Sequence, residues 1–297
     1  MRVAAVDCGT NSVRLLVRDR PGAELHREMR VVRLGQGVDA TGELHPDAIE
    51  RTRVALVDYA EVCRSLGVER TRFVATSATR DARNRDDFVA MVTAVLGVAP
   101  EVISGDEEAA LSFAGATLDL DAPGPYLVMD IGGGSTELVL GAAEVLAARS
   151  MDVGCVRLTE RHLVSDPPTA QQVAAARADI AAGIAWAREV VPVERAVTAV
   201  GLAGSVTTVA ALALGLTAYD ASRIHLSRLS ADQIAQVTGD LLAMTRAERA
   251  ALPVMHPGRV DVIGGGALVL RTIVEELGLA EVVVSESDIL DGIALTA

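Results

Sequence analysis

The chain has 297 residues, half of them apolar, and a formal net charge of −13. This length suits one large or two medium domains with a substantial core, and the negative charge argues against general affinity for nucleic acid or anionic membranes. We therefore expect no nucleic-acid and no membrane partner, although an arginine cluster with a metal ion can still bind a polyanion. All 27 basic side chains are arginine, which coding bias explains better than selection for phosphate binding.

The cysteines and the apolar segments bear on location. Cys8, Cys63 and Cys155 are scattered and odd in number, as is typical of proteins in a reducing cytosol. The sequence has no charged-then-apolar leader and no apolar run of membrane length, so we expect a soluble cytoplasmic protein. Aromatic residues make up 2% of the chain, so platforms for stacking nucleobases are scarce.

The N-terminus is predicted to form a hairpin around a glycine turn. The apolar residues 3–6 precede Asp7-Cys8-Gly9-Thr10-Asn11-Ser12, and a second apolar stretch follows at residues 13–17. Both stretches are rich in strand-forming residues and are short, which predicts strand, tight turn and strand. Residues 24–34 alternate enough to suggest further strands of the same sheet.

A helix and a strand then lead to a polar segment. The helix is predicted over residues 45–66, where Gly67 ends it, and residues 72–76 form a buried strand. The strand ends in residues 77–84, which are rich in Thr, Arg and Asn, before a helix at residues 85–96. Polar residues at the carboxyl end of a strand are where open α/β sheets bind ligands. Solvated arginines at a helix N-terminus explain this spacing equally well.

An acidic helix start and a linker close the first half. Asp106, Glu107 and Glu108 follow a short strand, where carboxylates ordinarily cap a helix and complement its dipole. The next helix ends near residues 119–125, a run of Asp, Pro and Gly that is the clearest linker in the chain. We therefore expect two domains, residues 1–122 and residues 123–297.

The stretch Asp130-Ile131-Gly132-Gly133-Gly134-Ser135-Thr136-Glu137-Leu138 is a second glycine turn between apolar strands. Three glycines allow positive φ angles and close approach of a ligand to the main chain. Carboxylates such as those of Asp130 and Glu137 would repel a phosphate unless a hard cation such as Mg²⁺ lies between them. A lone run of three glycines is more often an ordinary hairpin turn.

The two turns are copies of each other. Residues 7–17 align without gaps on residues 130–140, so that Asp7 corresponds to Asp130 and Ser12 to Ser135. Such a repeat indicates two similar halves, each contributing a phosphate-binding hairpin to a shared cleft. Chance explains the paired pattern far less well than it explains either turn alone.

The second half repeats the plan of the first. A strand at residues 145–151 leads into a helix, Pro167-Pro168-Thr169 caps a long helix to about residue 190, and a strand at residues 196–200 precedes another helix. Ser230 is a predicted N-cap. Residues 263–266, Ile-Gly-Gly-Gly, suit either the approach of a nucleotide or tight helix packing.

The paired turns resemble the phosphate motifs of the superfamily that contains actin, Hsp70 ATPases and sugar kinases. Within it, the motifs at residues 7–12 and 130–138 are similar to those of the exopolyphosphatase/guanosine pentaphosphate phosphatase (Ppx/GppA) family, and the resemblance covers essentially the whole chain. It implies an α/β fold of two ribonuclease H-like (actin-like ATPase) domains with a cleft between them. Longer members add a C-terminal helical module, so we expect the short two-domain form.

The resemblance also assigns roles. It implies that one glutamate of the Gly-x-Glu-Glu-Ala element is the catalytic base, which falls best on Glu108 with Glu107 as the alternative, and that Asp130 and Glu137 belong to the catalytic centre. Asp7 and Asp130 are the expected metal ligands. The candidate substrate-binding residues are Thr10, Asn11, Ser12, Arg14, Arg80, Asn84, Gly132, Gly133, Gly134, Ser135, Thr136, Arg157, Gly204 and Ser205.

These features predict an exopolyphosphatase that releases terminal phosphate from inorganic polyphosphate with Mg²⁺, or alternatively Mn²⁺, and that prefers short chains. Hydrolysis of guanosine pentaphosphate (pppGpp) is the close alternative, which the few aromatic residues disfavour. An ATP-dependent kinase, favoured by residues 263–266, and an ATP-gated assembly protein are more distant alternatives. We also expect a homodimer.

Overall fold

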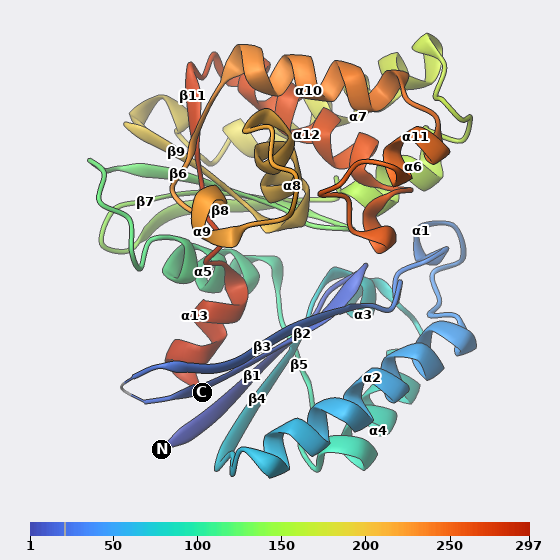
Figure 1. Cartoon of the computed structure of the whole chain (residues 1–297), viewed down its shortest axis with the longest axis vertical. Helices are drawn as coiled ribbons and strands as arrows, with labels where there is room; N and C mark the ends of the chain where they lie inside the picture. Colours follow the sequence, from blue (N-terminus) through green and yellow to red (C-terminus); the bar gives the residue numbers. More distant parts are fainter. Residues whose placement is uncertain (21) are drawn as a thin grey trace. The chain divides into compact units, whose positions relative to one another are not determined.

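The computed structural model describes residues 1–20 and 22–297, which form two compact units. Unit 1 comprises Met1–Gly115 and Ile289–Ala297, and unit 2 comprises Ala116–Asp288. Each unit is a mixed β-sheet covered by helices (Figure 1), so the predicted α/β class is confirmed. The cleft expected between the two halves stays a prediction.

Unit 1 is built on a five-stranded sheet in the order β3-β2-β1-β4-β5. Strands β1, β2 and β3 are joined as antiparallel hairpins, whereas β4 and β5 run parallel to β1. The elements are β1 Arg2–Cys8, β2 Ser12–Asp19, β3 Glu24–Val31, α1 Val38–Thr41, α2 Pro46–Ser65, β4 Arg70–Ala75, α3 Ser77–Asp81, α4 Arg85–Leu96, β5 Glu101–Val102, α5 Gly105–Ala116 and α13 Ile289–Thr296.

Both faces of the central strand β1 are buried, and its successive residues point to opposite sides of the sheet. Val6 and its neighbours on one face pack with α2 and α4 around Tyr59 and Phe88. Ala5 and Leu16 on the other face pack with α5 and α13. Helices therefore cover both sides of these strands (Figure 1).

The last helix belongs to unit 1, which differs from the expected assignment of residues 123–297 to one domain. Ile293 of α13 packs in the cluster that contains Leu16, and Gly292 lies so close to the Leu111 carbonyl oxygen that an added Cβ would stand 2.0 Å from it. Arg27 on β3 donates to Asp291 at 2.6 Å. A chain-order boundary misses this packing because α13 is joined to unit 1 by contacts and not by sequence.

Unit 2 repeats the strand order of unit 1. Its sheet is β10-β11-β9-β6-β7-β8, in which β8-β7-β6-β9-β11 corresponds to β3-β2-β1-β4-β5. The elements are β6 Tyr126–Ile131, β7 Thr136–Gly141, β8 Val145–Met151, α6 Cys155–Arg161, α7 Ala170–Arg188, η1 Val193–Arg195, β9 Thr198–Leu202, α8 Ala203–Ala213, α9 Ala221–Ile224, β10 Arg228–Ser230, α10 Ala231–Ala243, α11 Arg246–Ala250, η2 Pro257–Arg259, α12 Ile263–Leu277 and β11 Glu281–Val284.

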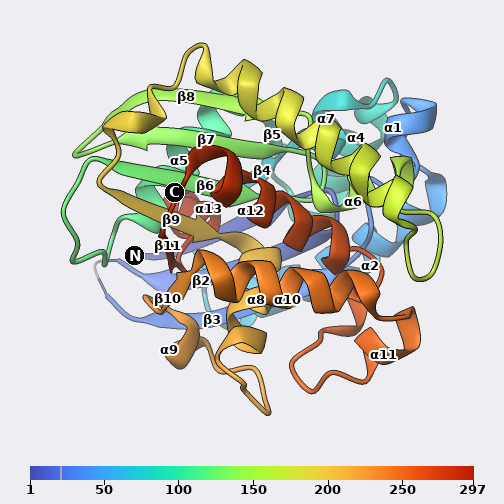
Figure 2. The same cartoon turned by 90° about the horizontal axis from the view of Figure 1, so that it is seen from above.

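The core of unit 2 lies between its sheet and three long helices. Leu127, Met129 and Leu138 of the sheet join one cluster with Ile180 of α7 and Ile273 of α12. Helix α12 lies between α7 and α10 (Figure 2). The sheet and these helices thereby give β6 and β7 a rigid frame.

Several local predictions are confirmed. Helix α4 spans the predicted residues 85–96, and α2 ends just before Gly67, which has a φ of 63°. Thr169 and Ser230 cap α7 and α10 with complete capping boxes. Among the residues that the structure describes, no helix combines the length and the apolar character needed to cross a membrane.

Candidate active site

The first glycine turn joins β1 to β2 in unit 1. The Gly9 amide donates to the Ser12 carbonyl at 2.9 Å and closes the turn. Asp7 and Arg14 face each other across the hairpin, and both Nη2 and Nε of Arg14 donate to Asp7 Oδ2, at 2.6 and 3.0 Å. Asp7 is almost fully buried. Its charge is therefore met by a guanidinium within its own hairpin.

The carbonyl oxygens of this turn are fixed by the segment that follows β3. The Gly35 amide donates to the Thr10 carbonyl at 2.8 Å, and the Arg33 amide donates to the Asn11 carbonyl at 2.8 Å. In the described part of the chain, the amides of Thr10 and Asn11 donate no hydrogen bond. Fixed carbonyls and open amides are the arrangement by which a backbone turn binds an anion.

The second turn, between β6 and β7 of unit 2, has the same arrangement with different partners. The Gly132 amide donates to the Ser135 carbonyl at 3.0 Å. The first amides of α6 hold the glycine carbonyls: Cys155 donates to Gly132 at 3.0 Å, and Val156 to Gly133 at 2.8 Å. Within residues 1–20 and 22–297, no hydrogen bond from the amides of Gly133 and Gly134 is formed.

Gly154 is required for this contact between α6 and the turn. A Cβ at Gly154 would lie 2.4 Å from the Gly133 carbonyl oxygen and 2.6 Å from the Gly134 nitrogen. Both are backbone atoms, so no side-chain rotation relieves the collision. The side chain of Arg157 adds a bond from Nε to the Gly134 carbonyl at 2.7 Å. Arg157, predicted to bind substrate, therefore supports the turn.

The acidic residues of unit 2 form a row across three strands. Asp130, Glu137 and Ser150 are register partners on β6, β7 and β8, so their side chains share one face of the sheet. Asp130 is 7% exposed and Glu137 is 1% exposed. The Ser150 hydroxyl donates to Glu137 Oε1 at 2.6 Å.

This row suits a magnesium ion better than the Asp7–Arg14 pair of unit 1 does. Mg²⁺ is usually held by one or two carboxylates together with substrate phosphates and water, and not by a cage of protein ligands. No cluster of three or more His, Cys, Asp or Glu side chains suited to a metal occurs among the described residues. Asp130 and Glu137 supply two facing carboxylates, whereas Asp7 is paired with Arg14. The metal role of Asp7 stays a prediction.

The two candidate bases on α5 lie in different surroundings. Glu108 is 8% exposed, and Arg80 Nη1 donates to its Oε2 at 2.9 Å and to the Ile103 carbonyl at 3.1 Å. The Glu107 side chain is 46% exposed and forms an ion pair with Arg72 at 3.0 Å. Burial and a fixed orientation favour Glu108 as the base.

The carboxyl ends of the parallel strands in unit 1 bring several predicted residues together. β1 leads to Thr10, β4 to Ser77 and Arg80, and β5 to Glu108, and the hydroxyls of Thr10 and Ser77 lie 2.8 Å apart in the interior. Asn84 is held by the segment after β3. Its side chain bonds both the amide and the carbonyl of Leu44. Its predicted contact with substrate phosphate stays a prediction.

In unit 2, β9 leads to Gly204 and Ser205 at the start of α8. A Cβ at Gly204 would lie 2.3 Å from Nη2 of Arg259, so a guanidinium lies directly against this helix start. Ser205 is buried and packs on Gly266 of α12. Burial raises the pKa of the Cys155 thiol, although a hydrogen bond with Ser205 opposes the shift.

The Ile-Gly-Gly-Gly element is explained by packing. Gly264, Gly265 and Gly266 are buried inside α12. A Cβ at Gly265 would lie 2.8 Å from the Cys155 carbonyl oxygen, and one at Gly266 would lie 2.0 Å from the Ser205 hydroxyl. Of the two alternatives for this element, the structure therefore supports tight helix packing.

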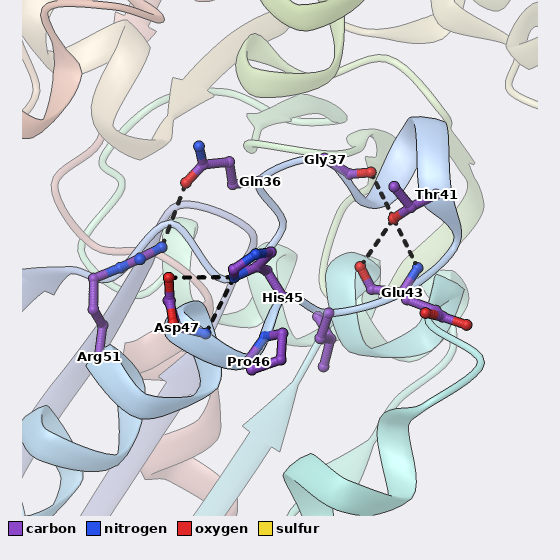
Figure 3. Close-up of a pocket in the computed structure, with 9 residues that line it drawn as sticks. Gln36, Gly37, Thr41, Glu43, His45, Pro46, Asp47 and Arg51 are labelled. Carbon is purple, nitrogen blue, oxygen red and sulfur yellow. Dashed lines mark hydrogen bonds and ion pairs between the residues drawn. The ribbon is translucent and has the colours of Figure 1, made fainter.

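A pocket of about 490 Å³ lies between Gln36 and the start of α2 (Figure 3). The carboxylates of Glu43 and Asp47 line it, and the guanidinium of Arg51 is engaged with the Val32 carbonyl at 2.8 Å. His45 uses Nδ1 to accept from the Asp47 amide as the N-cap of α2. This balance of charges does not suit a polyanion.

Sequence reasoning missed four residues that contact predicted site residues. They are Ser77, Ser150, Gly154 and Arg259. Ser150 becomes visible only when the β7–β8 register is known. Arg259 lies in η2 and contacts the start of α8, about 55 residues earlier in the chain. Ser77 and Gly154 stand in motifs that were recognised, but their roles depend on contacts with Thr10 and Gly133 of the two turns.

The fold and the two turns define a class: duplicated α/β units, each with a glycine turn at the carboxyl end of its first strand. The chain belongs to the Ppx/GppA phosphatase family, whose family model matches residues 16–296. It is therefore a member of a family of phosphate-releasing hydrolases.

Relatives and solved structures agree with this membership. The chain is 55% identical to exopolyphosphatase 2 of Mycobacterium tuberculosis, over 99% of this chain and 98% of that protein. It is 31% identical to the guanosine-5'-triphosphate,3'-diphosphate pyrophosphatase of Aeromonas salmonicida, over 98% of this chain and 58% of that protein. The crystal structure of an exopolyphosphatase-like protein superposes with a TM-score of 0.97 at 45% identity, covering 99% and 98% of the two chains. The Aquifex aeolicus family member gives a TM-score of 0.81 at 30% identity, covering 100% and 97%.

Proposed function

We propose that this protein is an exopolyphosphatase that releases orthophosphate from the end of inorganic polyphosphate, and that it prefers short chains. The observation that carries the proposal is the pair of turns, whose carbonyl oxygens accept hydrogen bonds from other segments. Among the described residues, the amides of Thr10, Asn11, Gly133 and Gly134 donate no hydrogen bond. Repeated phosphate groups need repeated donors of this kind. The full-length similarity to exopolyphosphatase 2 of M. tuberculosis supports the same substrate.

In the proposed reaction, a water oxygen attacks the terminal phosphorus and the bond to the bridging oxygen breaks, so the shortened chain leaves with that oxygen. Glu108 accepts the proton that the water loses, and Arg80 holds the Glu108 carboxylate in place. The open amides stabilise the charge that develops on the phosphoryl oxygens. Mg²⁺, held by Asp130 and Glu137, would neutralise phosphate charge when bound.

Hydrolysis of pppGpp is the second candidate, because a relative that matches 98% of this chain is named guanosine-5'-triphosphate,3'-diphosphate pyrophosphatase. The chain has three Phe, three Tyr and one Trp, which gives few surfaces on which guanine could stack. We therefore place polyphosphate first. The kinase alternative loses its main feature, because the glycines of residues 264–266 are buried in α12.

The decisive experiment incubates the purified protein with polyphosphates of defined length, pppGpp and ATP, each with Mg²⁺ or with EDTA. We expect orthophosphate from polyphosphate, with kcat/KM levelling off as the chain lengthens, and no acceptor requirement. Faster release of orthophosphate from pppGpp would show that pppGpp, and not polyphosphate, is the preferred substrate. Tight ATP binding with negligible turnover would instead indicate an ATP-gated assembly protein.

Two further expectations belong to this proposal. We place the protein in the cytoplasm, a location that suits its three free cysteines, of which Cys8 and Cys155 are buried. We also propose a homodimer, which sedimentation of the purified chain would test.

A further inference from the structure

The hydroxyl of Ser150 is the feature of unit 2 that the proposed mechanism does not yet use. It donates to Glu137 Oε1 at 2.6 Å from the neighbouring strand, the length expected for a hydroxyl that donates to a carboxylate. Glu137 is 1% exposed, so water cannot readily replace this donor. A bond of this kind therefore determines how the Glu137 carboxylate is oriented.

Glu137 has a like charge on its other side. It faces Asp130 across β6–β7 and Ser150 across β7–β8. Carboxylates that directly face each other repel, and the repulsion is stronger where little water screens it. The Ser150 hydroxyl, at the end of the row, offsets this repulsion because it supplies the positive end of an O–H dipole.

Unit 1 provides an internal comparison for this row. The residues that correspond to Asp130, Glu137 and Ser150 in the paired strands are Asp7, Arg14 and Met29. Where the middle residue is an arginine that already neutralises the aspartate, the third position is apolar. Where the middle residue is a second carboxylate, the third position is a hydroxyl donor.

We propose that Ser150 is a positioning residue that holds the Glu137 carboxylate in the geometry needed to bind a divalent cation together with Asp130. The proposal rests on the proposed function only in giving Asp130 and Glu137 a cation to bind. Residues that orient a metal ligand commonly change metal affinity by ~10–100-fold when they are removed. Ser150 acts through Glu137 and is not itself assigned a contact with the substrate.

The test measures binding of Mn²⁺ alone, without substrate, from the loss of the electron paramagnetic resonance signal of the free ion. We expect Ser150→Ala to weaken binding about 10-fold and Ser150→Thr, which keeps the hydroxyl on a strand-forming residue, to stay within about 2-fold of wild type. Ser150→Cys keeps the size with a weaker donor and should lie between them. Asp130→Asn and Glu137→Gln should abolish the site.

The matched control is Thr198→Val in the same sheet. The Thr198 hydroxyl donates to the Pro123 carbonyl at 2.7 Å at the start of β9, whereas Asp130 lies beside the end of that strand. The variant should lose stability without losing Mn²⁺ affinity. The single tryptophan, Trp186, reports folding of each variant by fluorescence. If Ser150→Ala does not fold, the Mn²⁺ affinities of Ser150→Thr and Ser150→Cys can still be compared with that of the wild type.

Wild-type affinity in folded Ser150→Ala would overturn the proposal, as would unchanged affinity in Glu137→Gln or the absence of saturable Mn²⁺ binding by the wild-type chain. Failure of the proposed function has a different signature. If the wild-type protein binds Mn²⁺ but releases no phosphate from polyphosphate, polyphosphate is not its substrate. The order of Mn²⁺ affinities among the variants would still decide the role of Ser150.

Discussion

The two glycine turns agree in their backbones and differ in their charges. Both close with a bond from the glycine amide to the carbonyl three residues later, and both have their carbonyls fixed by other segments. Across the hairpin, however, Asp7 meets Arg14 in unit 1, whereas Asp130 meets Glu137 in unit 2. The duplicated feature is thus a set of main-chain donors, which side-chain changes do not remove.

This difference suggests a division of labour. A hairpin with a paired aspartate and arginine carries little net charge and can hold phosphate by its amides without a cation. Two facing buried carboxylates repel phosphate, and we therefore assign the proposed cation to the hairpin of unit 2. The proposed base, Glu108, lies outside both turns, on α5 of unit 1. The predictions below test these three assignments in order of expected effect.

The largest effect is expected for Glu108→Gln. The amide keeps the shape of the side chain and can still meet Arg80, but it cannot accept a proton from water. We expect kcat for polyphosphate hydrolysis to fall ~10²–10⁴-fold, the contribution typical of a general base, while binding of the substrate persists. Phosphate release and equilibrium binding of short polyphosphate measure the two quantities separately.

Glu107→Gln is the matched control. Glu107 is exposed and pairs with Arg72, and exposed ion pairs contribute little. The activity of Glu107→Gln should therefore remain within a few fold of the wild-type activity. The opposite ranking of the two variants would move the base to Glu107 and would leave Arg80–Glu108 as a structural pair.

A second prediction compares how the turns are supported. Gly154→Ala would place a Cβ 2.4 Å from the Gly133 carbonyl oxygen, which forces the backbone of the turn to move. Displacements near 1 Å cost about 10²-fold in rate, so we expect a loss of that order in kcat/KM with the protein still folded.

Gly35→Ala should cost less, about 10-fold. Its Cβ would lie 2.3 Å from a methyl group of Thr10, and that side chain can turn if the bond from Thr10 to Ser77 is given up. Kinetics of both variants, with thermal unfolding as the check on folding, measure the difference. Equal losses would show that both turns are supported by backbone contacts of equal stiffness.

A third prediction separates the two aspartates by their dependence on metal. Asp130→Asn should raise the Mg²⁺ concentration needed for half-maximal activity by ~10–100-fold, because it removes a carboxylate from the proposed cation site. Asp7→Asn should leave this concentration near the wild-type value and reduce activity through the loss of its ion pair with Arg14. Mg²⁺ titrations of both variants decide the matter. Full activity in excess EDTA would remove the cation from unit 2 as well.

Much of this arrangement could be predicted because its signals are local. The β1 and β6 strands, their glycine turns and the capping boxes at Thr169 and Ser230 each depend on residues within a few positions of one another. The repeat also predicted that Asp7 and Asp130 occupy equivalent places, and the shared strand order confirms the two similar halves.

What could not be predicted depends on pairing between distant segments. Asn84 and Arg157 have side chains suited to phosphate, yet Asn84 bonds the backbone of Leu44 and Arg157 bonds that of Gly134. The sequence separations are about 40 and 23 residues, and no periodicity within either segment specifies the partner. Helix α13 docks on unit 1 for the same reason, through contacts with strands near the other end of the chain.

The smallest expected effect distinguishes a support from a ligand. Arg157→Lys keeps the charge but loses the bond from Nε to the Gly134 carbonyl. If Arg157 supports the turn, kcat/KM should fall about 5-fold, as the loss of one hydrogen bond worth ~1 kcal/mol implies, and the fall should be the same for short and long polyphosphates. Arg161→Lys, on the same helix but paired with Asp179, is the matched control and should have no effect. A loss that grows with chain length would mean that Arg157 holds a phosphate beyond the terminal one. The two turns would then no longer be equivalent in binding phosphate through the main chain alone.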